Sequence, residues 1–383
     1  MPNDVVAPDD PHAQEREALR DTVRTFLDRS STEADVRRLM ETETGYDETV
    51  WKQAADQLGL TGLAIPEEYD GSGFGPLELS VVFEELGRSM FCGPFFSTVG
   101  LAASTLLASD DDAAKKEWLP KIASGQAIAT LALTEESSSW DLADITTTAT
   151  RDGSGWKLSG TKWYVLDGSI ADLVLVVARA ESEVAVFAVA GDATGLTREP
   201  MVTMDLTRKM SRLTFDGVDA QPIGSQAVGR EIVERALLMA ATYLSAENVG
   251  GAQRCLDLAA DYARERVQFG RPIGSFQAIK HKLANLLTEV EQARSASYFA
   301  SREAAAGKSG ETTDDLPLAA SIAKSYTSDA FFHAAADNVQ IHGGIGFTWE
   351  HPAHLYFKRA KTNQLLLGSP SYHRGLVADR VGI

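Results

Sequence analysis

Apolar residues recur at helical spacing in the first part of the chain and again in the last part, whereas the middle part alternates in short runs. Between residues 11 and 29, Leu19, Val23, Phe26 and Leu27 fall on one helical face. Similar patterns fill the rest of this part, at 47–60, 77–90, 95–108 and 112–124. We therefore predict a helical N-terminal domain at residues 1–130, with residues 1–10 expected to form a disordered tail.

The pattern changes after Ala127, where short runs rich in Val, Thr and Leu replace the helical periodicity. These runs cover 146–151, 155–158, 162–166, 173–177, 184–189 and 210–215. Asp-Gly and Ser-Gly pairs separate them, and such pairs favour tight turns. Because no helical pattern stands between consecutive runs, the sheet should be antiparallel rather than doubly wound. Residues 131–229 are predicted to form a small antiparallel β-barrel or sandwich.

From residue 230 onward the chain is predicted to be helical, at 230–267, 276–306, 315–344 and 352–366. Pro317 suits the first turn of a helix, and Gly343-Gly344 suits the end of one. Three long antiparallel helices and a shorter one indicate a four-helix bundle at residues 230–383. The fold class is therefore α+β and multi-domain.

Composition narrows the classes of function. The net charge of −18 argues against nucleic acid as a partner, because phosphate binding needs a basic face. No apolar run approaches the roughly 20 residues that span a bilayer, and the polar N-terminus is not a secretory signal. Cys92 and Cys255 are the only cysteines, so a disulfide framework is not expected. A cytoplasmic protein that is not bound to a membrane fits these features.

Three stretches carry mixed chemistry that is hard to produce by chance. They are R-E-R-V-Q-F-G-R-P-I followed by F-Q-A-I-K-H (264–281), L-A-L-T-E (131–135) and Q-I-H-G-G-I-G-F (340–347). Together they resemble the acyl-CoA dehydrogenase family over nearly the whole chain. The resemblance implies FAD as cofactor, an acyl-CoA substrate, an electron-transferring flavoprotein as electron acceptor, and a tetramer with FAD between subunits.

The resemblance also assigns cofactor contacts. Arg266 and Gln268 would reach the pyrophosphate side of a neighbour's FAD, and Gln340, Gly343 and Gly344 would receive its ADP portion. Arginine offers a planar fork of donors to phosphate, and glycine lets backbone amides approach closely. The remaining cofactor-binding positions implied by the family are Phe269, Gln277, Thr134 and Tyr164, of which Thr134 and Tyr164 would lie at the flavin ring.

Two positions depart from the family pattern. Leu166 stands where the family carries a threonine near the ring, and Leu367 stands where most relatives carry the catalytic glutamate. A minority of relatives place the base at the position that matches Ala240. None of these side chains can accept a proton. The pair Ala240-Ala241 leaves room that favours a branched or polycyclic acyl group.

Glu247 is the carboxylate that we predict to be the catalytic base. It lies two helical turns beyond Ala240, on much the same face, among small and apolar neighbours. Burial would raise its pKa toward the working pH. The alternative is a buried glutamate paired with a structural arginine.

Several functions remain open. The leading one is a dehydrogenase that forms a trans-2-enoyl-CoA as a homotetramer. A second is a partner subunit of an α2β2 complex that completes the FAD site without all catalytic groups. A third is a flavin monooxygenase or oxidase on the same fold. His351 and His354 are too few ligands for a metal, so no metal site is predicted.

Overall fold

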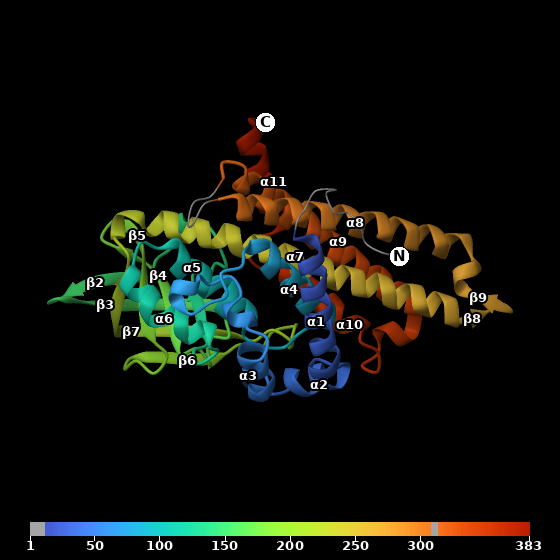
Figure 1. Ribbon diagram of the computed structural model, residues 1–383, viewed down its shortest axis with the longest axis horizontal. Helices are drawn as coiled ribbons and strands as arrows, with labels where there is room; N and C mark the ends of the chain where they lie inside the picture. The colour runs from blue at the N-terminus through green and yellow to red at the C-terminus, as the bar shows by residue number, and fades with distance from the viewer. Residues whose placement is uncertain (1–11, 308–312) are drawn as a thin grey trace.

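The computed structural model describes residues 12–307 and 313–383, and the tail predicted at residues 1–10 lies outside them. Helices, a β-sheet and a helical bundle follow one another along the chain (Figure 1). In that view the sheet occupies one end of the molecule and the tip of the bundle occupies the other. This order confirms the predicted fold class.

The N-terminal part is helical because apolar residues repeat at helical spacing and polar side chains cap the helix starts. Thr32 and Asp35 form a reciprocal capping box, while Asp47 and Asp111 accept first-turn backbone amides. The helices are α1 (Ala13–Ser30), α2 (Glu33–Met40), α3 (Glu48–Asp56), α4 (Pro76–Ser89), η3 (Phe96–Ala103), α5 (Ser104–Ala108) and α6 (Asp112–Ala123). Helix α2 was not predicted, because eight residues give too short a periodic pattern.

The segment η3 is a π-helix, not part of the single α-helix predicted at 95–108. All of its residues are buried. The Thr98 hydroxyl both accepts from the Ala129 amide and donates to the Ala129 carbonyl, each at 3.1 Å. This exchange ties the wide helix to the first strand of the sheet, and π-helical turns of this kind are frequent near functional sites.

The middle part forms a seven-stranded sheet whose central strands close on themselves. Its strands are β1 (Ala129–Ala132), β2 (Thr148–Asp152), β3 (Gly155–Leu166), β4 (Leu173–Ala180), β5 (Glu183–Ala190), β6 (Leu196–Pro200) and β7 (Met210–Ile223). The order β4-β2-β3-β7-β5 returns from β5 to β4, which makes a small barrel. The predicted barrel or sandwich architecture is thereby confirmed.

The wholly antiparallel pairing that we predicted needs correction, because β1 and β2 both run parallel to β4. The long connection at 133–147 carries the chain across before β2 begins, so β1 and β2 are not neighbours in the sheet. Two predicted turns are also absent. Ser159-Gly160 lies within β3 and Asp216-Gly217 within β7, where Gly217 (φ 62°) is the extra residue of a bulge.

The C-terminal part has the four predicted helices within two residues of their expected ends, and one more. They are α7 (Gly229–Glu265), α8 (Gln277–Ala306), α9 (Leu316–His342), α10 (Ala353–Leu365) and α11 (Pro370–Val381). Helix α11 was missed because Gly368-Ser369-Pro370 resembles a stop. Instead Ser369 caps the new helix and Pro370 occupies its first turn.

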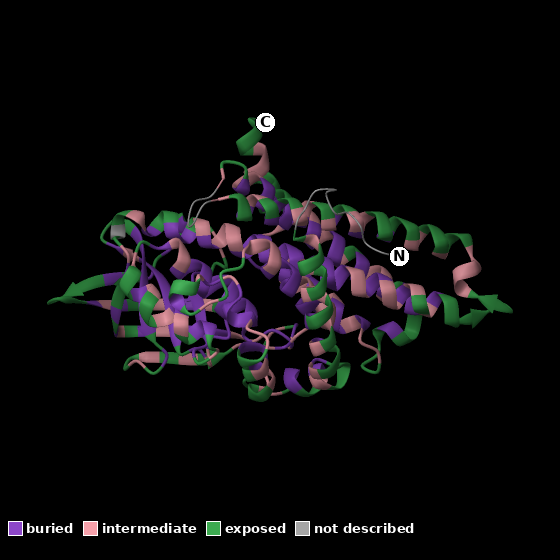
Figure 2. Ribbon diagram, in the orientation of Figure 1, coloured by how far each residue is buried: buried purple, intermediate pink, exposed green. Residues whose placement is uncertain are grey.

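Helix α7 is the axis of the molecule, running from the sheet to the far tip of the bundle (Figure 1). Buried residues concentrate along it and in the sheet (Figure 2). Helix α4 packs closely against α7 at Gly250. A Cβ on Gly250 would lie only 1.8 Å from the Glu84 carbonyl oxygen, so this close approach requires glycine. None of the described helices has the length and apolarity that would cross a membrane.

Candidate active site

An exposed hairpin between α7 and α8 carries the first group of predicted cofactor residues. Strands β8 (Val267–Gln268) and β9 (Arg271–Pro272) pair across a turn at Phe269-Gly270, where both residues have positive φ. The Phe269 side chain is 92% exposed, and Arg266 and Gln268 are also exposed. The hairpin stands at the tip of the bundle, away from the sheet (Figure 1). An aromatic ring so exposed indicates a surface that another molecule covers.

The second predicted group follows the end of α9. Gln340, Gly343 and Gly344 are exposed, and a Cβ on either glycine would meet nothing within 4 Å. The His342 ring stacks on Tyr262 at 4.3 Å between centroids, and Tyr262 lies one turn before Arg266. The two groups therefore lie at the same end of the bundle. The structure brings these predicted residues together on one exposed edge.

This edge has the chemistry of an anion site. Arg266 supplies a fork of donors, and the open backbone at Gly343-Gly344 admits a phosphate without a Cβ in the way. Gln277 begins α8, and its side-chain nitrogen lies 2.7 Å from the His281 imidazole. Among residues 12–307 and 313–383, no group of three or more His, Cys, Asp or Glu side chains is arranged to hold a metal.

The two residues predicted to contact the flavin ring lie elsewhere, at the junction of β1 and β3. The Thr134 hydroxyl donates to the Trp163 carbonyl at 2.6 Å, and the Thr134 carbonyl accepts from the Trp163 amide at 2.9 Å. Thr134 is thus buried and its hydroxyl proton is already used. Tyr164 has φ 57° and sits in a bulge of β3, with 37% of its side chain exposed.

Leucines fill the space between these strands, α7 and the α10–α11 connection. Leu166 and Leu367 are 2% and 4% exposed, and they belong to one buried apolar cluster that also contains Leu133, Ala240 and Leu244. Leu367 is held in the left-handed region (φ 61°), where a branched side chain is strained. The side chains of Leu166 and Leu367 supply neither a donor for the flavin edge nor a proton acceptor.

The connection that carries Leu367 is held by a buried lysine. Lys324, fully buried on α9, donates to the carbonyls of Asn363, Gln364 and Gly368 at 3.0, 3.2 and 2.8 Å. The His373 Nε2 lies 2.9 Å from the Leu367 carbonyl. Burial lowers the pKa of Lys324 to about 7. These contacts fix the backbone on both sides of Leu367.

Glu247 lies in a buried network of ion pairs. Its Oε1 accepts from the guanidinium of Arg208, from Arg359 Nη1 at 3.1 Å and from Asn363 Nδ2 at 3.2 Å. Arg359 also meets Asp205 at 3.1 Å. Burial by itself would raise the pKa of Glu247, but the two arginines outweigh burial and hold that pKa below its ordinary value. Glu247 is therefore an ionised carboxylate whose Oε1 accepts from three side chains.

That setting does not suit the base role predicted for Glu247. A general base needs a pKa near the working pH, whereas Arg208 and Arg359 hold the pKa of Glu247 below its ordinary value. The contacts match the other interpretation, a buried glutamate paired with structural arginines. The sequence pattern indicated burial correctly, but Arg208 and Arg359 are 39 and 112 residues away and could not be assigned as partners.

Asp167 is a second buried carboxylate beside the ring strands. It directly follows Leu166, and its Oδ2 accepts from the Ser97 hydroxyl at 2.6 Å. Burial raises the pKa of Asp167 to about 6, against the opposing effects of the Ser97 hydrogen bond and of Arg208. A cavity of only about 20 Å³ separates Asp167 from the Glu247 network. There is no room there for an acyl chain.

A larger groove of about 950 Å³ opens on the other side of Leu367. It runs between α7, the start of α9 and α11, and Trp140 from the 133–147 connection covers part of it. Its charged side chains are Asp110, Glu231, Glu234, Arg235 and Arg380. Three acids against two arginines leave no cationic surplus for the phosphates of a nucleotide.

Four residues of this region escaped the sequence analysis: Arg208, Arg359, Asp167 and Lys324. Lys324 had the best available signal, because it stands between Ala323 and Ser325 on a helix rich in small residues. Such a position is buried by its neighbours, so a cation there needs carbonyl or carboxylate partners. Arg208, Arg359 and Asp167 had no local signal, because their partners are far away in sequence.

Family models match the chain in three consecutive parts. Residues 13–126 match the acyl-CoA dehydrogenase N-terminal domain, residues 130–218 the middle domain and residues 228–382 the C-terminal domain. Among curated proteins, the acyl-CoA dehydrogenase IpdE2 of Mycobacterium tuberculosis is 35% identical, over 93% of this chain and 94% of the relative.

Solved structures are similar over almost the whole chain. One is titled as the Tcur3481-Tcur3483 steroid ACAD, with 31% identity, a TM-score of 0.85 and coverage of 96% of this chain and 98% of that one. Another is the ChsE4-ChsE5 complex from Mycobacterium tuberculosis, with 28% identity, a TM-score of 0.87 and coverage of 97% and 98%.

Proposed function

The chain belongs to the acyl-CoA dehydrogenase family, and from this membership we propose that it takes part in FAD-dependent α,β-dehydrogenation of an acyl-CoA thioester. The product would be a trans-2-enoyl-CoA, and electrons would pass to an electron-transferring flavoprotein. FAD, when bound, supplies the acceptor for the hydride that leaves the β-carbon. The remaining question is which groups this chain contributes.

The residues present fit one half of FAD and not the other. The exposed edge with Arg266, Gly343 and Gly344 suits the phosphates and the ADP half. At the ring position, the Thr134 hydroxyl already donates to the Trp163 carbonyl, and the Leu166 side chain has no hydrogen-bond donor. We therefore propose that Arg266, Gln268, Phe269, Gln277, Gln340, Gly343 and Gly344 bind FAD, and that Thr134 and Tyr164 do not form a complete ring pocket.

The two half-sites are also too far apart to serve one FAD within a chain. Ala240 packs with the ring strands, while Arg266 follows the end of α7. The 26 residues between them rise about 39 Å along a helix at 1.5 Å per residue. The exposed edge of one chain is therefore suited to the ring strands of a neighbouring chain. This supports an oligomer in which FAD lies between subunits.

We propose that this chain is the partner subunit of a two-chain α2β2 enzyme, and that the second chain carries the base. The observation that carries this proposal is the state of the carboxylates at the ring strands. Among the described residues, the buried carboxylates there are Glu135, Asp167 and Glu247, and each is hydrogen-bonded within the chain. Leu367 replaces the family base in a closed apolar cluster.

The chemistry would then be divided between the chains. The second chain would remove the α-proton and bind the thioester, and this chain would hold the phosphates with Arg266 and the amides at Gly343-Gly344. The titles of two similar structures name pairs of proteins, which is consistent with such a division. One of those titles also names a steroid enzyme, so a bulky polycyclic acyl group is the substrate class that we propose.

The stoichiometry of FAD tests the proposal. The chain is expressed alone and together with a candidate second chain, and FAD per chain is measured by absorbance after gel filtration. We expect no FAD and no acyl-CoA oxidation from the chain alone, and one FAD per pair of chains in the complex. A yellow homotetramer with one FAD per chain that oxidises an acyl-CoA would overturn the partner-subunit role.

A matched pair of arginine variants tests the exposed edge within the complex. Arg266→Ala should weaken FAD binding by about 10-fold or more, because a charge-assisted phosphate contact is lost. Arg264→Ala is the control, since Arg264 is exposed and pairs only with Asp261 on its own helix. Equal FAD retention in both variants would show that the edge does not hold the phosphates.

The homotetrameric dehydrogenase remains the second candidate because of one observation. The groove of about 950 Å³ beside Leu367 is large enough for an acyl group in this chain. If the FAD measurement gives one cofactor per chain, this groove is the place where the substrate would be sought.

A further inference from the structure

A separate cavity of about 480 Å³ lies on another face of α7. Arg235, Met239 and Tyr243 line it and follow one another at four-residue spacing, so they form a single helical stripe. Ala240 and Leu244, which pack with the ring strands, are each one position further along and face about 100° away. The cavity therefore lies on a different face of α7 from Ala240 and Leu244, whereas Glu247 lies one turn beyond Tyr243 on the same face. It touches the larger groove only at Ala108 and Arg235.

Most of the cavity wall is apolar and comes from four parts of the chain. The 64–76 connection, the π-helix with α5, helix α7 and the start of α9 contribute Ile65, Val99, Ala103, Leu107, Met239 and Leu316. Met239 is only partly buried and packs beside Leu316. Volume and lining are those of a small-molecule site, which are usually concave, mostly apolar and equipped with few polar groups.

One polar group lies deep in this wall. Tyr243 is 3% exposed, its ring stacks on Phe83 at 5.1 Å, and its hydroxyl has no hydrogen-bond partner among the described residues. The hydroxyl oxygen is not among the sealed polar atoms, so it opens onto accessible space. Burial raises the pKa of Tyr243, so the hydroxyl keeps its proton. An unpaired donor in an apolar pocket calls for a ligand acceptor or a water.

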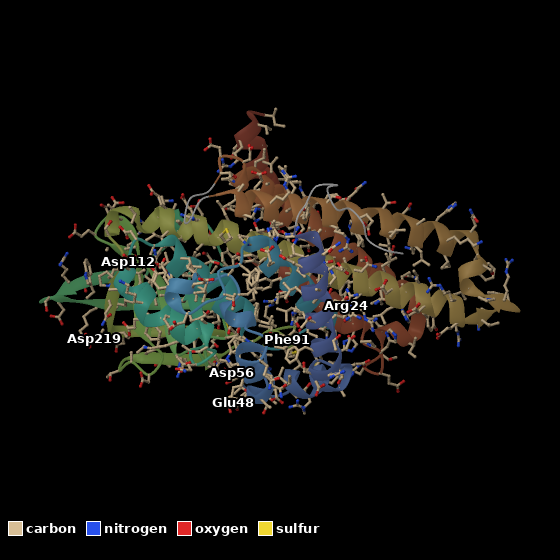
Figure 3. The ribbon with its side chains drawn as sticks, viewed as in Figure 1. Arg24, Glu48, Asp56, Phe91, Asp112 and Asp219 are labelled. Atoms are coloured by element: carbon tan, nitrogen blue, oxygen red, sulfur yellow. The ribbon has the colours of Figure 1, made fainter. Side chains whose placement is uncertain are left out.

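The rim of the cavity carries charged side chains of both signs. Lys115, with 16% of its side chain exposed, lines it together with Arg235. Glu68 is an exposed acid on the same rim, and the exposed carboxylate of Asp112 lies 4.0 Å from Lys115. Asp112, labelled in Figure 3, marks the start of α6 and so the position of this rim.

We propose that this cavity binds a small apolar carboxylate with a hydrogen-bond acceptor, such as a ketone, at its inner end. The carboxylate meets Lys115 and Arg235 at the rim, the hydrocarbon lies against Met239 and the π-helix, and the inner acceptor meets the Tyr243 hydroxyl. The site is independent of the proposed FAD edge, which lies at the other end of α7. Its ligand is a free acid, not a CoA thioester, because the cavity is too small for the nucleotide.

Two probes that differ by one ketone test the inner contact. Octanoate and 7-oxooctanoate are titrated by isothermal calorimetry into the full-length protein, or into its two-chain complex if that is the soluble form. The keto acid should bind about 3- to 10-fold more tightly, the usual effect of one hydrogen bond. Tyr243→Phe, which removes only the hydroxyl, should abolish that difference and leave octanoate binding unchanged.

Two lysine variants test the rim. Lys115→Ala should weaken octanoate binding by about 5- to 10-fold without changing the binding of octanol, which has no charge. Lys116→Ala is the matched control, because Lys116 is the exposed neighbour on the same helix and does not line the cavity. Thermal unfolding of each variant checks that the fold is kept.

A variant that fills the cavity supplies the third arm. Met239→Trp should remove the binding of both acids while the FAD content of the protein stays the same. The proposal is overturned if octanoate and octanol bind equally, if neither Tyr243→Phe nor Lys115→Ala changes the titrations, or if no acid binds at millimolar concentration. None of these results bears on FAD stoichiometry, so the two proposals fail separately.

Discussion

At the scale of single residues, the buried charges of this protein are neutralised inside the chain. Glu247 meets Arg208 and Arg359, and Arg359 in turn meets Asp205. All four are less than 10% exposed, so water cannot replace a missing partner. Removing one member of such a network leaves a buried charge uncompensated, which typically destabilises a protein by about 3–5 kcal/mol. A network of this kind holds α7, α10 and the β6–β7 connection together.

Glu247→Gln should therefore lower the free energy of unfolding by about 3 kcal/mol, measured by urea denaturation. Glu234→Gln is the control, because Glu234 makes an exposed pair with Arg230 and should change stability by less than about 1 kcal/mol. If Glu247→Gln instead kept full stability and lost only turnover, Glu247 would regain the role of catalytic base.

Histidines near the proposed FAD edge make the free energy of unfolding depend on pH. His342 and His351 lie 4.1 Å apart between ring centroids, and His354 packs against Trp349. Burial lowers the pKa of all three, that of His354 to about 4, and Lys358 and Arg37 lower it further for His354 while Glu33 opposes them. Each ring is therefore neutral in the folded protein near pH 7.

Because these folded-state pKa values lie below the unfolded value of about 6.5, the unfolded chain binds more protons. Their contribution to stability is complete above about pH 6.5 and is lost as the pH falls from 6.5 toward 4. His354→Phe should flatten the profile of unfolding free energy by about 1 kcal/mol over this range, after allowance for partial exposure. Superimposable profiles for His354→Phe and wild type would refute this assignment.

At this scale, how well the sequence predicts which residues act together depends on how far apart they lie along the chain. The residues of the exposed edge sit in continuous motifs, so Arg266, Gln268 and Gly343 could be named together in advance. The partners of Glu247 could not, because tertiary packing brings them from positions 39 and 112 residues away. The amino-acid sequence alone can indicate that a carboxylate is buried, but it does not indicate which cation neutralises it.

At the scale of elements, the connection between α10 and α11 is shaped by one side chain. Lys324 reaches across from α9 and donates to three carbonyls of residues 363–368, so its ammonium satisfies acceptors at and beyond the C-terminal end of α10. The same connection carries Leu367 in its left-handed conformation. The backbone at the family's usual base position is therefore kept in place although the base is missing.

Lys324→Met should release this connection. Three buried carbonyls would lose their donor, so the free energy of unfolding should fall by about 2–4 kcal/mol. Amide hydrogen exchange of residues 366–369 should speed up more than that of the α9 centre. Lys280→Met, on the exposed side of α8, is the matched control and should change neither quantity. Unchanged exchange at 366–369 in Lys324→Met would show that the connection is held by packing alone.

Long elements were predictable and irregular ones were not. The 3.6-residue repeat located α7, α8 and α9 almost to the residue, because each helix buries an apolar face over many turns. The bulge at Gly217 and the strand-internal Gly160 looked like turns, since glycine after Asp or Ser also favours turns. The π-helix and the parallel pairing of β1 with β4 depend on contacts across the domain, which periodicity does not record.

At the scale of the whole molecule, the chain separates two half-sites that a FAD would need together. The edge with Arg266 lies at the tip of α7, and the ring strands lie near its other end (Figure 1). We propose that a neighbouring chain completes the site. A chain that keeps its edge but closes its ring pocket with Leu166 and Leu367 would contribute to a neighbour's site without having one of its own.

Restoring the two family residues tests that view. The double variant Leu166→Thr with Leu367→Glu should give no acyl-CoA oxidation by the chain alone and no bound FAD. The new glutamate would enter a buried apolar cluster, where burial raises its pKa and destabilises the fold. Turnover with an artificial acceptor and FAD absorbance are the measurements, and Leu287→Glu, at a half-exposed site on α8, controls for the added charge. If the double variant alone bound one FAD per chain and oxidised a thioester, the ring pocket would be intact and only the base would have been lost.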